Sequence, residues 1–115
     1  MVTPSPASIV VIPFPFSDLS GTKLRPAVVL TDAGRGDWLL CQITSNPYSD
    51  PDAIPITSKE LQKGVLTSTI SFARPIKLFT ASESVIDKRV AIVKDATFKA
   101  ILMATIESLR KNMPT

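Results

Sequence analysis

The hydrophobic positions of this chain fall into short runs rich in β-branched residues, separated by polar segments that carry proline or glycine. Runs of this kind are typical of β-strands bounded by turns. They predict strands at residues 8–12, 25–32, 37–45, 53–57, 70–72, 76–80 and 85–93, with one helical turn within 58–64. Because proline cannot donate to a strand ladder, Pro75 is expected to separate the strand at 70–72 from the strand at 76–80.

The last part of the chain has a different hydrophobic period. Apolar positions and one threonine recur there at the i, i+3, i+4, i+7 and i+11 spacing of a helix face: Phe98, Ile101, Leu102, Thr105 and Leu109. The spacing predicts one amphipathic helix over residues 96–111. Asp95 is the residue type that commonly caps a helix N-terminus, and we expect it to do so here.

Several short strands followed by one late helix predict a mostly β fold with a C-terminal α-helix, in which antiparallel strands curl into a barrel. The length of 115 residues suits a single domain, residues 1–115. Residues 1–7 have the composition of a short flexible tail and lack the basic start of a signal peptide. No hydrophobic run approaches transmembrane length, so no membrane association is expected.

Composition narrows the chemistry further. The chain has no histidine, which excludes imidazole-based mechanisms, including the Ser-His-Asp triad and the two-histidine route to RNA cleavage. It has one cysteine, Cys41, so no disulfide forms within one chain, and a reducing, cytoplasmic location is expected. The net charge of +3 is compatible with a polyanionic partner.

Arg25 is the first candidate functional residue. Pro26 follows it and restricts its backbone to extended conformations, so the guanidinium leaves the strand in a fixed direction. A planar guanidinium presents two N–H groups to two phosphate oxygens, which makes it a good phosphate receptor. On spacing alone, an ordinary solvated arginine at a strand end is the commoner alternative.

Two further groups of polar residues stand near strand ends. Thr44 and Ser45 end the third predicted strand, where their hydroxyls either face a groove or close a turn. In "SFARPIKLFT", Ser71, Arg74 and Lys77 accompany a second arginine–proline pair. Solvated charges on an edge strand are the alternative interpretation there.

Three segments in order resemble the MazF/PemK-like family of ribosome-independent endoribonuclease toxins: "IVVIPFPFSDLSGTKLRPAVVL", "QITS" and "SFARPIKLFT". The matching order spans nearly the whole chain. The resemblance implies an SH3-like barrel with a C-terminal helix and a homodimer that cleaves single-stranded RNA without a metal or other cofactor. It also implies a cognate MazE-like antitoxin with a disordered acidic tail.

The resemblance assigns roles to individual residues. Arg25 matches the catalytic arginine of the family's "RP" motif, and Thr44 matches its catalytic threonine. The expected RNA-binding residues are Lys23, Ser45, Ser71, Arg74 and Lys77. The RNA supplies the nucleophile, its 2′-hydroxyl, so Arg25 has to stabilise a charged phosphorane. Whether Arg25 also transfers a proton stays open at this point.

Two other functions remain open from the sequence. One is a toxin of the same fold that binds DNA gyrase without catalysis, as CcdB-like proteins do. Those proteins share a Trp-containing C-terminal tail, whereas this chain ends in "SLRKNMPT" and has Trp38 as its one tryptophan. The other is a non-catalytic nucleic-acid-binding barrel, because binding and cleaving RNA require similar charges.

Overall fold

The structure, a computed structural model, describes residues 3–15 and 22–115. Strands, interrupted at two places by a short 3-10 helix, make up the described chain up to one α-helix near the C-terminus. The elements are β1 (Ser8–Pro15), β2 (Thr22–Gly34), β3 (Asp37–Thr44), β4 (Ile54–Ile56), η1 (Ser58–Glu60), β5 (Leu61–Gly64), β6 (Ser71–Ser82), η2 (Glu83–Val85), β7 (Lys88–Val93) and α1 (Asp95–Arg110).

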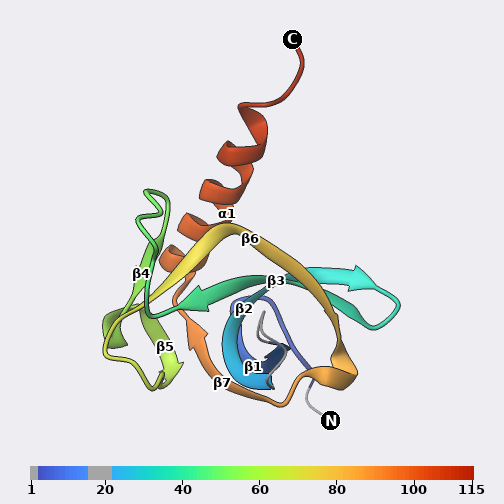
Figure 1. Ribbon diagram of the computed structural model, residues 1–115, viewed down its shortest axis with the longest axis vertical. Coiled ribbons are helices and arrows are strands. Elements are labelled where there is room, and N and C mark those ends of the chain that lie inside the picture. Colours follow the sequence, from blue (N-terminus) through green and yellow to red (C-terminus); the bar gives the residue numbers. More distant parts are fainter. Residues whose placement is uncertain (1–2, 16–21) are drawn as a thin grey trace.

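The described strands form one antiparallel sheet in the order β4-β6-β3-β2-β1-β7-β5. The sheet curls into a nearly closed barrel. In Figure 1, β6 arches above β3 at the top of the barrel, and β7 passes below β1. Helix α1 packs against β4 and β6 and carries the C-terminus away from the barrel. The predicted fold class, an antiparallel SH3-like barrel with one C-terminal helix, is confirmed.

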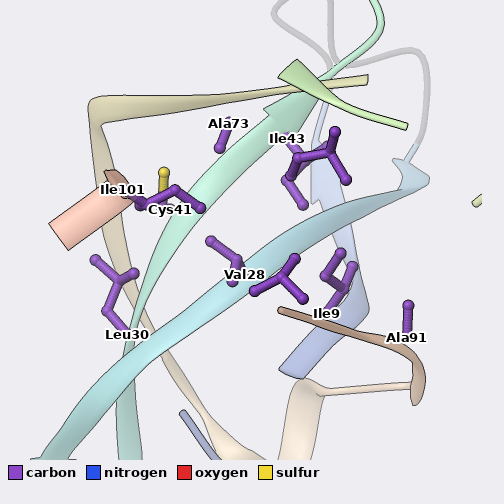
Figure 2. Close-up of a cluster of buried hydrophobic side chains, with 10 residues drawn as sticks. Ile9, Val28, Leu30, Cys41, Ile43, Ala73, Ala91 and Ile101 are labelled. Atoms are coloured by element: carbon purple, nitrogen blue, oxygen red, sulfur yellow. The ribbon is translucent and has the colours of Figure 1, made fainter. Parts of the chain in front are cut away.

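The three central strands are buried on both faces. Successive side chains of a strand point to opposite faces, and consecutive residues of β1, β2 and β3 enter two different hydrophobic clusters. One cluster receives the helix through Ile101 (Figure 2): Ile9, Val28, Leu30, Cys41, Ile43, Ile56, Ala73, Ala91, Val93 and Ile101. The other consists of Val10, Ala27, Val29, Leu40 and Ile86. Burial on both faces explains why these strands read as continuous apolar runs instead of alternating ones.

The N-terminal segment contacts the barrel. Pro4 is buried. The Ala7 N–H donates to the Val29 carbonyl (3.0 Å), and the Val93 N–H donates to the Ala7 carbonyl (3.0 Å). Residues 3–7 are thus attached to β2 and β7, where the sequence predicts a flexible tail.

β1 continues through two prolines. Pro13 and Pro15 pair with Leu24 and Thr22 of β2, while β7 pairs with β1 only over residues 8–11. The prolines therefore stand beyond the reach of the β7 ladder, where a missing N–H leaves no bond unmade. This extends both β1 and β2 past the predicted boundaries.

Pro75 does not interrupt β6, and the predicted break is wrong. β3 pairs Cys41 with Leu78 but pairs Ile43 with Ala73, so β6 has extra residues around Pro75. Residues of such a bulge need not donate to the ladder, which makes room for a proline inside the strand. The Pro75 carbonyl accepts a hydrogen bond from the Thr105 hydroxyl of α1 at 2.9 Å.

The segment 58–64 is helical only at its start. Thr57 and Glu60 form a capping box around η1, and Leu61–Gly64 then joins β7 as strand β5. Gly64 has φ of +86°, and a Cβ there would collide with the Val90 carbonyl oxygen of β7. The helical turn therefore ends at Glu60 and not at Gly64, which instead ends β5 and permits close contact between the two strands.

The predicted helix is confirmed at 95–110, but its cap is not. Asp95 is the first helical residue, and the N-cap position is occupied by Lys94, which makes no side-chain capping bond. Asp95 still places its carboxylate in the first turn, where the helix dipole favours negative charge.

Candidate functional site

A pocket of about 160 Å³ opens where β2 and β3 cease to pair. The last pair of their ladder joins Ala27 to Gln42. Beyond it, residues 23–26 of β2 and 43–45 at the end of β3 line the pocket, together with residues 66–68 and Ser71. Parts of three segments distant in sequence thus meet at one end of the barrel.

The pocket brings together five of the seven residues predicted from sequence: Lys23, Arg25, Thr44, Ser45 and Ser71. Of the lining residues described, the ionisable ones are both cations, and five carry hydroxyl groups: Thr44, Ser45, Thr67, Ser68 and Ser71. Cations together with hydroxyl donors form an environment suited to a phosphate group.

Arg25 is half-buried at the edge of this pocket. Arg25 pairs with Ile12 of β1, and Pro26 pairs with Val11 of the same strand. If the register of Ala27 and Gln42 is continued by two residues, Arg25 comes opposite Thr44 and on the same face. The expectation that Arg25 and Thr44 share one site therefore agrees with the geometry.

Thr44 is 8% exposed, so its hydroxyl is largely shielded from solvent. Its Oγ1 accepts a hydrogen bond from the Asn46 backbone N–H at 3.1 Å. A hydroxyl that accepts from an N–H keeps its own proton for donation. Thr44 is therefore able to donate to an anionic oxygen in the pocket.

Arg74 and Lys77 do not line the pocket. The Arg74 Nε donates to Asp50 Oδ2 at 3.1 Å, and its side chain is 18% exposed. Its Cζ lies 5.6 Å from the centroid of the Tyr48 ring. Lys77 is an exposed residue of β6 on the other side of Pro75. The guanidinium of Arg74 is thus engaged with residues of the loop between β3 and β4.

Comparison with protein families decides the assignment. The family described as "PemK-like, MazF-like toxin of type II toxin-antitoxin system" matches residues 5–109. The chain belongs to this family. The resemblance drawn from "KLRPAVVL" and the later segments is thereby confirmed.

Solved structures agree with the family's fold. The chain is similar to a MazF in the MazE–MazF complex of Deinococcus radiodurans, at 16% identity and a TM-score of 0.75, covering 95% of this chain and 98% of that chain. An endoribonuclease of a mycobacterial species, in complex with its cognate antitoxin, has 13% identity and a TM-score of 0.68 over 97% and 100%. The toxin MazF-mt6 of Mycobacterium tuberculosis has 12% identity and a TM-score of 0.64 over 88% and 96%. Comparison with curated proteins finds no match.

The pocket also contains residues that the sequence alone did not indicate as functional. Thr67 and Ser68 contribute hydroxyls to the pocket from the segment between β5 and β6. The hydroxyl-rich run "TST" at 67–69 was the available signal. From the sequence, Asp18 at the start of the first loop is expected either to orient Arg25 or to cap the turn, but it belongs to residues 16–21, which lie outside the described residues.

The loop that follows Thr44 is ordered by its own polar side chains. Asn46 Oδ1 accepts from the Tyr48 N–H, and Asp50 Oδ1 accepts from the Asp52 N–H, both at 2.9 Å. The bond from Asp52, followed by the bond from Arg74, lowers the pKa of the Asp50 carboxyl below its ordinary value. Asp50 is therefore a carboxylate at neutral pH, and it joins the loop to β6.

Cys41 has no place in catalysis. It is fully buried in β3, and its Sγ–H donates to the Arg74 carbonyl at 3.0 Å. Burial raises the pKa of the thiol to about 12, despite that hydrogen bond. The thiol therefore stays protonated and serves as a small core residue.

The part of the chain that the structure describes has neither a metal-binding cluster nor a membrane-spanning helix. Within 3–15 and 22–115, no three histidine, cysteine or acidic side chains are grouped closely enough to ligate an ion. Among the helices described there, none combines the length and apolar character that crossing a membrane requires.

Proposed function

We propose that this chain is an endoribonuclease toxin that cleaves single-stranded RNA and is neutralised by a cognate antitoxin. The observation that carries the proposal is the pocket in which Arg25 and Thr44 meet on neighbouring strands. Membership of the toxin family supports it, as does the fold shared with a mycobacterial endoribonuclease.

The proposed reaction uses the RNA's own nucleophile. The 2′-oxygen forms a bond to the adjacent phosphorus, and the bond from phosphorus to the 5′-oxygen breaks. The 2′-hydroxyl loses its proton and the leaving 5′-oxygen gains one. The products are a 2′,3′-cyclic phosphate and a 5′-hydroxyl.

Arg25 stabilises the charge that develops on the phosphorane. A guanidinium is a planar cation with forked N–H donors, so we assign Arg25 an electrostatic role. One preorganised donor aimed at developing charge contributes about 3–4 kcal/mol to lowering a barrier. Pro26 helps this preorganisation by limiting the backbone of Arg25.

The other pocket residues position the substrate. Thr44 donates its hydroxyl proton to a non-bridging phosphate oxygen, because its oxygen already accepts from Asn46. Lys23 contacts the backbone phosphates as a flexible point charge. Ser45 and Ser71 offer further hydroxyls in the same pocket. Arg74 and Lys77 do not line this pocket, so we do not include them among the residues that contact the cleaved phosphate.

We further propose two protein partners. Helix α1 leaves large apolar side chains exposed on its outer half, namely Met103, Ile106, Leu109 and, beyond its end, Met113. Ile76 of β6 is also exposed. A second copy of the chain would cover part of this surface in a homodimer. The acidic tail of an antitoxin would compete with RNA for the basic pocket.

Incubation of the purified protein with a long single-stranded RNA in EDTA tests the proposal. Cleavage with cyclic phosphate ends, lost in Arg25→Ala, is the expected result. RNA binding without cleavage would contradict it and favour a nucleic-acid-binding barrel. Neither binding nor cleavage would also contradict it and favour a toxin that acts on a protein target such as gyrase.

A further inference from the structure

One exposed aromatic side chain belongs to the loop that follows the pocket-lining end of β3. Tyr48 is 65% exposed, and its backbone has φ of +54°, followed by Ser49 at +60°. Non-glycine residues rarely adopt two successive left-handed conformations, and such strain concentrates at functional sites. The loop holds this shape through hydrogen bonds from the Tyr48 N–H to Asn46 Oδ1 and from the Asp50 N–H to the Pro47 carbonyl.

Arg74 supports the ring from one side. Its guanidinium carbon lies 5.6 Å from the ring centroid, within the range of a cation–π contact. Arg74 is itself held by Asp50, and the two side chains are only 18% and 14% exposed. One face of the Tyr48 ring thus contacts a fixed cation, and the exposure of the residue leaves the opposite face open to solvent.

The chain connects Tyr48 closely to the pocket. Tyr48 comes four residues after Thr44, the last residue of β3, and both Thr44 and Ser45 line the pocket. Arg74 lies three residues after Ser71 on β6, and Thr44 pairs with Phe72 between them. A nucleotide next to the one held in the pocket therefore comes within the neighbourhood of Tyr48.

We propose that Tyr48 is a base-stacking residue, which receives a nucleobase flanking the cleaved phosphate on its open face, and that Arg74 and Asp50 are positioning residues for the ring. The inference rests on the proposed function, since the ligand is the same RNA. Single-stranded nucleic acids bind proteins through aromatic rings of this kind, because each base has a flat apolar face. The structure thereby assigns Arg74 a supporting role in place of a direct phosphate contact.

The test measures binding with RNAs that lack one base at a time. All variants carry Arg25→Ala so that the RNA stays intact, and the probe is a short labelled RNA with a single abasic site at each position in turn. The parent protein is expected to lose about tenfold in affinity at one abasic position. Adding Tyr48→Ala is expected to cause a similar loss with intact RNA but less than twofold further loss at that abasic position.

Matched variants separate stacking from general damage. Tyr48→Phe keeps the ring and is expected to bind within twofold of the parent, whereas Tyr48→Leu is expected to bind as weakly as Tyr48→Ala. Val85→Ala removes an exposed apolar side chain from η2 and is expected to leave affinity unchanged. Asp50→Asn is expected to weaken binding severalfold, but to add no loss in a Tyr48→Ala background.

Three outcomes would overturn the inference. They are unchanged affinity in Tyr48→Ala, equal effects of Tyr48→Ala at every abasic position, and loss of antitoxin binding with RNA binding intact. The last would assign the ring to a protein partner. If the protein with Arg25 restored binds RNA through Tyr48 yet does not cleave it, the endoribonuclease proposal fails while the stacking assignment stands.

Discussion

Arg25 on β2 and Thr44 on β3 each stand two residues beyond the last pair of their ladder, which joins Ala27 to Gln42. Both line the pocket that opens where pairing stops. The relationship places a fixed cation and a hydroxyl donor on one face of the sheet. It is the structural basis for the proposed chemistry.

Replacing Thr44 tests the hydroxyl directly. We expect Thr44→Val to lower kcat about 10- to 100-fold, because a hydrogen bond to a charged group contributes roughly 1.5–3 kcal/mol. The measurement is single-turnover cleavage together with thermal unfolding. Thr44→Ser retains the hydroxyl and is expected to stay within a few fold of the parent. Equal losses in Thr44→Ser and Thr44→Val would indicate that the methyl group, and not the hydroxyl, matters.

The register that joins Arg25 to Thr44 was beyond the reach of sequence patterns. The β2–β3 hairpin starts with Gly34 opposite Asp37, and that register alone would place Arg25 opposite Asn46. Two register shifts along the ladder, each of one residue, move the partner to Thr44. No local sequence signal marks them, and a shared site for the two residues was predicted only through family resemblance.

The strands themselves were predictable because the central ones are buried on both faces and read as apolar runs. The continuity of β6 through Pro75 was not, since it depends on a bulge set by the partner strand. The ion pair of Arg74 with Asp50 joins positions 24 residues apart. Sequence reasoning therefore assigned Arg74 to RNA, while the fold engages it with a loop.

Lys23 provides a test of backbone recognition. We expect Lys23→Ala to weaken RNA binding and to reduce the slope of log K against log salt by about 1, because one phosphate contact releases about one counterion. Binding to a labelled RNA at several salt concentrations measures this. Lys59→Ala on η1 is the matched control and should leave the slope unchanged. A slope that is the same in wild type and Lys23→Ala would remove Lys23 from the interface.

Cys41 predicts a loss of stability at alkaline pH. Its folded pKa, about 12, exceeds its ordinary value of 9.0. The unfolded chain therefore ionises first, and the stability from the protonated thiol is complete below pH 9 and lost as pH rises toward 12. As pH rises from 9 to 10, we expect the free energy of unfolding to fall with a slope that approaches about 1.4 kcal/mol per pH unit.

Denaturant unfolding of wild type and Cys41→Ala across this pH range isolates the thiol. The variant is expected to be less stable at pH 7 because it leaves a small cavity, but to lose less stability above pH 9. Parallel pH profiles for the two proteins would contradict the assignment.

The exposed apolar surface of α1 predicts self-association. We expect the double variant Ile106→Lys with Leu109→Lys to shift the protein from dimer to monomer in light scattering, with the barrel still folded by circular dichroism. Both residues are exposed, at 43% and 63%, so the change removes little packing within one chain. Lys59→Glu alters charge elsewhere and should leave the dimer intact. A wild-type protein that is monomeric at high concentration would contradict this part of the proposal.

The most direct measurement of the central claim is RNA cleavage by Arg25→Lys in EDTA, compared with wild type and with Arg35→Lys. Lysine keeps the charge but loses the fork that meets two phosphate oxygens, so we expect cleavage to fall by at least 100-fold, equivalent to about 3 kcal/mol. Arg35 stands in the exposed β2–β3 turn, and its variant should cleave as wild type does. All three proteins should unfold at similar temperatures. Near-wild-type cleavage by Arg25→Lys, or a requirement for an added metal ion, would contradict the account.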